Sequence, residues 1–142
     1  MGPLAHSGAA LSALVAGEGA ALARCADAAL SKPGTVTLEL ALLGTPQLVA
    51  ARVGAWSALV LRRLVSLRSW ALPNLIAGEA LVPEFLQQDA RPEPIAAALL
   101  ELLQGAARER QLAGFESVRK RLGDDVAAVR AAEIADSMLP AR

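Results

Sequence analysis

Short apolar runs alternate with helix-like segments along the first part of the chain. Residues 11–15 (LSALV) and 27–30 (DAAL) have the length of buried strands, and residues 18–25 between them have a helix-like composition. The second run ends at the turn signal Ser-Lys-Pro-Gly. The pattern predicts a strand, a helix and a second buried strand, in this order.

A second helix and a third strand are predicted directly after this turn. Thr35 is expected to cap the helix, because its hydroxyl can accept an otherwise unpaired amide of the first turn, and Gly44 with Pro46 stops it. Residues 47–53 (QLVAARV) then predict the third strand. Strands that alternate with helices at this spacing are typical of a parallel sheet with right-handed crossovers, so residues 1–53 predict a βαβαβ core.

The remainder, residues 54–142, is predicted to be mostly helical. Leucines beside Arg62 and Arg63 give residues 55–67 the pattern of an amphipathic helix, and a loop is expected at residues 72–78 (LPNLIAG). Further helices are expected at residues 84–88, 93–103, 106–122 and 124–139, with glycine breaks between the last three. No repeat or flexible linker divides the chain. We therefore expect one α/β domain, with a Rossmann-like parallel sheet followed by a helical tail.

Composition narrows the function classes. Hydrophobic residues make up 54% of the 142, but much of this is alanine, and arginines interrupt the apolar middle before it reaches the ~20 residues of a membrane span. The 14 basic and 14 acidic residues cancel and aromatic residues are few, which disfavours nucleic acid as a partner. The first 17 residues carry no Lys or Arg, so no secretory signal is predicted and we expect a cytoplasmic protein. The single Cys25 and the single His6 offer neither a disulfide nor a metal cluster.

The turn after the second predicted strand is the candidate for chemistry. Ligands of open parallel sheets bind at the carboxyl ends of strands, where helix amino termini present unpaired amides. Gly34 lets a phosphate approach the backbone, Thr35 adds a hydroxyl and an amide, and Glu39 one turn later can accept hydrogen bonds from a ribose diol. These features suit a nucleoside diphosphate. Taken alone, however, a simple capping role for the turn is favoured.

Three blocks in this order resemble the lipid-A-disaccharide synthase family. The segment SKPGTVTLELALLGTPQLVAARV, from residue 31 on, is similar to the family's Ser-Gly-Thr-x-Thr-Leu-Glu block with the Gly-x-Pro and strand that follow it. Residues 72–78 (LPNLIAG) look like its Leu-Pro-Asn-Leu-Leu-Ala-Gly, and residues 81–87 (LVPEFLQ) look like its Val-Val-Pro-Glu-Leu-Leu-Gln. The resemblance continues through residues 93–103 and 111–122, and covers the chain from about residue 27 to its end.

The resemblance implies a glycosyltransferase of the GT-B architecture, in which two Rossmann-like domains face a cleft. This chain would be part of the carboxy-terminal domain, which holds the UDP portion of the donor. The family transfers 2,3-diacylglucosamine from UDP to lipid X in lipid A (lipopolysaccharide) biosynthesis. Carried over by position, Gly34 and Thr35 would contact the diphosphate and Glu39 the ribose, while Asn74 and Gln87 would be further polar groups of the donor site. No metal or other cofactor is implied.

Departures from the family pattern bear on activity. Pro33 stands where the family usually has Ser, which removes a hydroxyl and an amide from the presumed phosphate loop, and Lys32 could supply a replacement charge. The acceptor-binding domain with its catalytic base is not recognisable in these residues, so we expect no catalytic residue here and no transfer by this chain alone. The chain is expected to be a partial domain, either a fragment or the second half of a split gene.

Several alternatives remain open. The chain could be a non-catalytic UDP-sugar-binding or interaction module, or part of another GT-B enzyme of cell-envelope synthesis. Trp56 and Trp70 beside basic residues could contact the cytoplasmic face of the inner membrane, although helix packing is favoured. A homodimer is also open. Turn formation alone could explain Asn74. Charged residues of the predicted helices, among them Glu84, are assigned to solvated faces without a role.

Overall fold

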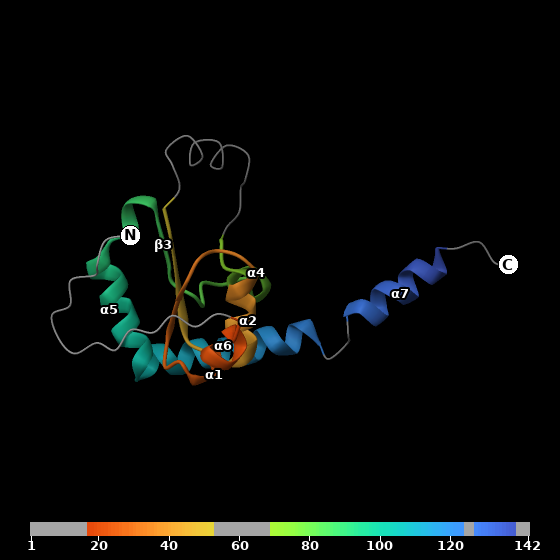
Figure 1. Cartoon of the computed structure of the whole chain (residues 1–142), viewed down its shortest axis with the longest axis horizontal. Helices are drawn as coiled ribbons and strands as arrows, with labels where there is room; N and C mark the ends of the chain where they lie inside the picture. Colours follow the sequence, from red (N-terminus) through yellow and green to blue (C-terminus); the bar gives the residue numbers. More distant parts are fainter. Residues whose placement is uncertain (1–16, 53–68, 124–126, 139–142) are drawn as a thin grey trace.

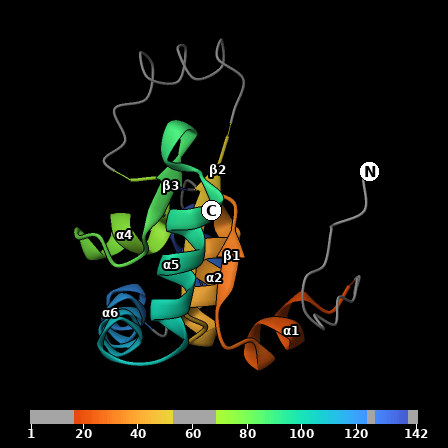
Figure 2. The ribbon, with the colours of Figure 1, turned by 90° about the vertical axis from the view of Figure 1, so that its left-hand side faces the viewer.

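Three short strands form a parallel sheet with helices around it. The computed structural model describes residues 17–52, 69–123 and 127–138. These ranges are drawn in colour in Figure 1, and in them the strands β1 (Ala29–Ser31), β2 (Gln47–Ala51) and β3 (Glu84–Leu86) lie in the order β1-β2-β3 (Figure 2). Ser31 of β1 pairs with Val49, and Val49 pairs with Glu84. The predicted α/β class with a partial parallel sheet is therefore confirmed, and the carboxyl ends of all three strands share one edge.

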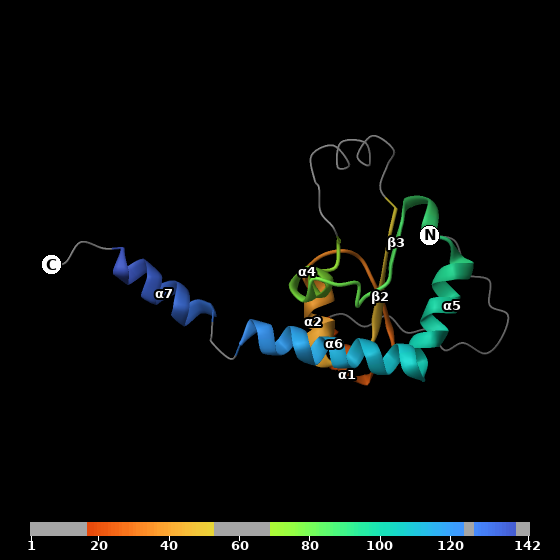
Figure 3. The same cartoon turned by 180° about the vertical axis from the view of Figure 1, so that it is seen from behind.

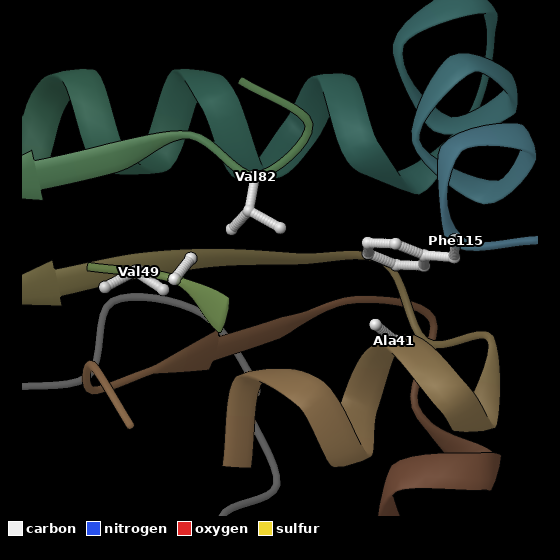
Figure 4. Packing of buried hydrophobic residues seen from close by; sticks show 5 residues of the cluster. Ala41, Val49, Val82 and Phe115 are labelled. Atoms are coloured by element: carbon white, nitrogen blue, oxygen red, sulfur yellow. The ribbon is translucent and has the colours of Figure 1, made fainter. Parts of the chain in front are cut away.

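Helices cover both faces of the sheet. The helix α2 (Thr35–Leu43) lies on one side of β2, and α5 (Pro92–Leu103) lies on the other side (Figures 2 and 4). The short helix α1 (Gly19–Cys25) packs against α2. Its position is fixed in part by Thr45, whose Oγ1 donates to the carbonyl of Ala23 at 2.7 Å.

The helix α6 (Ala106–Leu122) passes the amino-terminal end of the sheet and packs against α2, α5 and α4 (Leu72–Ala77) (Figure 3). The buried amide of Gln111 fixes it there. Its Oε1 accepts from the Gln47 N–H at 2.7 Å, and its Nε2 donates to the Gln47 and Leu81 carbonyls at 2.9 and 3.0 Å. Because every polar group of this contact is paired, α6 can close the amino end of the sheet without a desolvation penalty.

The hydrophobic core lies between α2, α6 and the sheet. It contains Ala41, Val49, Ala71, Val82 and Phe115, with Leu81 and Leu112 packed against it. In Figure 4 the side chains of Val82, Phe115 and Ala41 point toward one another, from the segment before β3, from α6 and from α2. Phe115 is only 2% exposed, so α6 contributes the largest apolar side chain of this cluster.

Most predicted elements are confirmed within a few residues. The helices expected at 18–25, 93–103 and 106–122 are α1, α5 and α6, and the helix expected at 124–139 includes α7 (Ala127–Ser137). The strands expected at 27–30 and 47–53 are β1 and β2. The strand expected at 11–15 and the helix expected at 55–67 lie outside the described residues. None of the described helices is long and apolar enough to cross a membrane.

Two assignments were wrong. The expected loop at residues 72–78 contains α4, which has Pro73 in its first turn and ends at Gly78 in the left-handed conformation, with φ of 77°. The helix expected at residues 84–88 is instead β3 followed by a 3₁₀ turn, η1 (Gln87–Asp89). Pairing with β2 supplies backbone hydrogen bonds that a short isolated helix would lack, so tertiary contacts override local propensity here.

Candidate functional site

Polar residues follow each of the three strands at the carboxyl edge of the sheet. Lys32 comes directly after β1, Arg52 after β2 and Gln87 after β3. Since neighbouring strands lie about 4.8 Å apart, the ends of β1 and β3 are separated by roughly 10 Å. The fold therefore brings Lys32 and Gln87, which are far apart in sequence, to one edge. Arg52 lies between them and was not among the predicted site residues.

The turn from β1 into α2 is built around Gly34. Gly34 has φ of 138° and ψ of −166°, a backbone conformation that essentially only glycine adopts without strain, and it is the N-cap of α2. Thr35 does not cap the helix, contrary to the prediction, because Thr35 is already its first helical residue and the cap lacks any side-chain hydrogen bond. Thr37 instead holds the turn: its N–H and its Oγ1 donate to the Gly34 carbonyl at 3.1 and 2.7 Å.

The start of α2 presents polar groups to solvent. Gly34, Thr35 and Val36 are exposed, and within the described ranges the amides of Thr35 and Val36 have no protein acceptor. Unpaired amides at the start of a helix carry a partial positive charge. The exposed cations Lys32 and Arg52 lie at the same edge. The local electrostatics thus favour an anion.

Glu39 lies one helical turn beyond Thr35, on the same face of α2. Its side chain is exposed, and in the part of the chain that the structure describes it forms neither an ion pair nor a hydrogen bond. A free carboxylate acts only as an acceptor, which suits vicinal hydroxyl groups. An anion at Gly34 and a diol at Glu39 would lie about one turn of helix, roughly 5–6 Å, apart.

Gln87 follows β3 in a left-handed conformation, with φ of 55°. Its carbonyl accepts from Arg52 Nε at 3.2 Å and from the Ala90 N–H at 3.3 Å. A non-glycine residue pays a conformational cost of about 1 kcal/mol or more in this region, and such residues concentrate at functional sites. The Arg52 contact joins the ends of β2 and β3, and the Gln87 side chain is half-buried beside it.

Asn74 occupies a different environment from the other predicted site residues. It is 5% exposed, and its side-chain amide is engaged on both ends. Nδ2 donates to the Val82 carbonyl at 2.9 Å and to Glu84 Oε1 at 3.1 Å, and Oδ1 accepts from the Leu81 and Val82 amides at 2.9 and 2.7 Å. These bonds tie α4 to the segment that leads into β3. Asn74 therefore has a structural reason to be an amide, beyond forming a turn.

Glu84 was assigned to a solvated helix face, and this was wrong. It begins β3, is half-buried, and accepts hydrogen bonds from the backbone amides of Trp70 and Ala71 at 3.0 and 2.8 Å, from the Ser69 hydroxyl, and from Asn74. Pro83 gave no warning, because proline restricts only the residue before it and is common at the start of a helix. The amides that precede α4 thus donate to a protein carboxylate, whereas those at the start of α2 have no protein acceptor within the described residues.

The fold and the groups at the carboxyl edge of the sheet resemble those of one class of α/β proteins. An open parallel α/β sheet with an unfilled helix amino terminus, cations and an exposed carboxylate at its carboxyl edge is the usual arrangement for binding an anionic nucleotide.

Comparison with known proteins gives the family. Residues 5–136 match the lipid-A-disaccharide synthetase family. A lipid-A-disaccharide synthase of Bradyrhizobium diazoefficiens is 53% identical over 93 residues, or 65% of this chain and 24% of that protein. Those of Rhodopseudomonas palustris strain CGA009 and Anaeromyxobacter dehalogenans strain 2CP-C are 43% and 44% identical over 78% and 84% of this chain. The chain belongs to the lipid-A-disaccharide synthetase family.

The match covers only part of these relatives. The chain spans 24% to 32% of their lengths, about a quarter to a third. The family match and these identities confirm the family assignment made from the blocks at residues 31–53, 72–78 and 81–87.

Proposed function

We propose that this chain supplies the UDP-binding part of a lipid-A-disaccharide synthase. The observation that carries the proposal is the open start of α2. There, Gly34 adopts a conformation that favours glycine, and the amides of Thr35 and Val36 beside Lys32 have no protein acceptor within the described residues. Membership in the family supports a sugar nucleotide as the ligand of this edge.

Each residue of the edge has a proposed role. The amides at the start of α2 and the Thr35 hydroxyl bind the diphosphate, and Lys32 adds a charge in place of the amide that Pro33 lacks. Glu39 accepts hydrogen bonds from the ribose hydroxyls. Gln87, held by its left-handed backbone, contributes its half-buried side chain amide to the donor site. Asn74 acts indirectly, because its own amide is already bonded within the protein.

The proposed reaction is an inverting hexosyl transfer. A hydroxyl oxygen of lipid X attacks the anomeric carbon of 2,3-diacylglucosamine, and the bond from that carbon to the diphosphate oxygen breaks. UDP leaves with the electron pair, and the hydroxyl proton passes to a base outside this chain. Positive potential at the start of α2 stabilises the charge that develops on the departing diphosphate.

Calorimetric titration of the chain with UDP and with 2′-deoxy-UDP tests the binding roles. We expect UDP to bind more tightly, because Glu39 accepts from the ribose diol. In Glu39→Ala the preference for UDP should disappear, a loss of about tenfold in affinity for UDP and little for the deoxy analogue. Glu109→Ala on α6, which removes an equally exposed carboxylate at the other end of the sheet, is the matched control. Failure of the unmodified chain to bind UDP would overturn the proposal.

A chimera tests the proposed activity. The chain replaces the corresponding part of the Bradyrhizobium diazoefficiens enzyme, and disaccharide formation is measured from UDP-2,3-diacylglucosamine and lipid X. We expect transfer by the chimera and none by the chain alone. Transfer by the chain alone would contradict the proposed division of roles. A folded chimera that binds UDP without transfer would favour the non-catalytic binding module instead.

A further inference from the structure

The carboxylate of Glu84 gathers several donors from one short segment. Its Oε1 accepts from the Ala71 and Trp70 amides at 2.8 and 3.0 Å and from the Ser69 hydroxyl, and its Oε2 accepts from the Trp70 amide at 3.1 Å. Asn74 Nδ2 adds a bond at 3.1 Å. None of these partners is charged. Residues 69–71 are therefore fixed on β3 by a single side chain from the first position of that strand.

The segment that Glu84 holds lies against the Gly34 turn. Ala71 forms a parallel backbone bridge with Gly34. The next amide, that of Leu72, donates to Thr37 Oγ1 at 3.2 Å, and the same hydroxyl donates to the Gly34 carbonyl at 2.7 Å. Thr37 is fully buried, so solvent does not compete for these bonds. Glu84 is therefore linked to Gly34 through the Ala71 amide, the backbone from Ala71 to Leu72, and the two hydrogen bonds of the Thr37 hydroxyl.

We propose that Glu84 is a positioning residue of the donor site, which acts by holding residues 69–71 against the Gly34 turn and thereby keeps the start of α2 open for a diphosphate. This inference rests on the proposed UDP site. Glu84 itself does not touch the ligand in this arrangement, since its oxygens are engaged with residues 69–71 and Asn74.

A carboxylate is needed because every partner is a donor. Glutamate offers two acceptor oxygens and, when ionised, no hydrogen to repel an N–H group. Glutamine would place an NH₂ group against the Trp70 amide or against the donors at Oε1, so one side of the contact must open. Glu84→Gln therefore changes the shape of the contact with almost no change in side-chain volume.

Ligand affinities separate positioning from general stability. UDP and uridine are titrated into the unmodified chain, into Glu84→Gln and into Thr45→Val, which loses one buried hydrogen bond to Ala23 away from the site. We expect Glu84→Gln to weaken UDP about tenfold and uridine less than about twofold, because only UDP uses the Gly34 turn. Thr45→Val should leave the ratio of the two affinities unchanged. An equal loss for both ligands in Glu84→Gln would overturn the inference.

A ligand-free measurement distinguishes failure of this inference from failure of the proposed function. In Glu84→Gln, amide hydrogen exchange should accelerate at Trp70, Ala71, Leu72 and Thr37, and stay unchanged at Gln47, which is bonded to Gln111 instead. Unchanged exchange at Thr37 and Leu72 would contradict the link whether or not UDP binds. If Glu84→Gln does not fold, Ser69→Ala removes one donor from the same carboxylate and should show the same pattern at smaller amplitude.

Discussion

Two helices begin side by side at the carboxyl edge of this sheet, and they differ in what fills their first amides. At α4, the amides of Trp70 and Ala71 that lead into the helix are filled by Glu84, and that of Leu72 is filled by Thr37. At α2, the exposed amides of Thr35 and Val36 find no acceptor within the described residues. Both starts are joined by the bridge between Gly34 and Ala71. The amides at the start of α4 are thus bonded within the protein, and we call this the filled start. Those of Thr35 and Val36 have no protein acceptor within the described residues, and we call the start of α2 the open start.

This difference separates Asn74 from the other predicted site residues, and it gives a structural task to Glu84, which was assigned no role from the sequence. Asn74 and Glu84 belong to the filled start, where they fix α4 and the segment before β3. Lys32, Thr35 and Glu39 belong to the open start and are exposed. Substitutions at the filled start should therefore lower stability and affect the ligand only through the Gly34 turn, as proposed for Glu84. Substitutions of the exposed side chains at the open start should act mainly on ligand binding.

The largest effect is expected at Asn74. Asn74→Ala leaves the amides of Leu81 and Val82 and the carbonyl of Val82 without their side-chain partner, two of these bonds being fully buried. Because unsatisfied buried groups are costly, we expect a loss of about 3 kcal/mol in the free energy of unfolding, measured by urea denaturation.

Gln88→Ala, an exposed polar truncation in the 3₁₀ turn, is the control for Asn74→Ala and should change the free energy of unfolding by less than about 0.5 kcal/mol. Equal effects of the two substitutions would show that the Asn74 bonds do not support the filled start.

The next effect is expected at Gly34. An added Cβ would meet no atom within 4 Å, so any penalty of Gly34→Ala comes from the backbone conformation alone. With φ of 138° the strain should cost about 2 kcal/mol or shift the turn, and UDP affinity should fall with it. Gly19→Ala is the matched control, since Gly19 also has open space and no positive φ. Thermal unfolding and UDP titration of both variants measure the difference.

Most of the helices and the strands β1 and β2 were predictable because their signals are local. The apolar periodicity of α5 and α6 can be recognised from adjacent residues alone. So can the breaks at Gly105 and Gly123. The turn at Gly34 was also expected from the sequence and the family blocks, and its role in binding a ligand stays a prediction. By contrast, β3 and α4 stabilise each other through Glu84 and Asn74, ten residues apart, and no local pattern encodes that contact.

The cap of α2 shows the same limit at the scale of one residue. A threonine next to the turn is a sound N-cap signal, yet the cap is Gly34, and Thr37 rather than Thr35 supplies the hydroxyl that binds the turn. Thr37 forms these bonds because it is buried between Gly34 and Leu72. This position depends on how α2 and α4 pack in the folded protein, so the local sequence does not show it. The Thr35 hydroxyl therefore has no capping role.

A smaller effect, and a test of the link between the two starts, is expected at Thr37. Thr37→Val keeps the shape of the side chain but leaves the Leu72 amide unpaired, while the Gly34 carbonyl still accepts from the amide of residue 37. We expect a loss of about 1–2 kcal/mol in the free energy of unfolding.

Combination of Thr37→Val with Glu84→Gln in a double-mutant cycle measures whether the two bonds act together. We expect a coupling free energy of at least about 0.5 kcal/mol, because both residues hold the segment that contains Ala71 and Leu72. Strictly additive effects would mean that the two helix starts are independent.

The smallest effect on stability is expected at Thr35, and it separates the two starts most cleanly. Thr35→Val removes a hydroxyl that caps nothing, from an exposed first position of α2, so the free energy of unfolding should change by less than about 0.5 kcal/mol. UDP affinity should nevertheless fall severalfold, because the hydroxyl is proposed to bind the diphosphate. Thr35→Ser, which keeps the hydroxyl, should restore the affinity. A loss of stability comparable to that of Thr37→Val would return Thr35 to a structural role and remove the contrast between an open and a filled helix start.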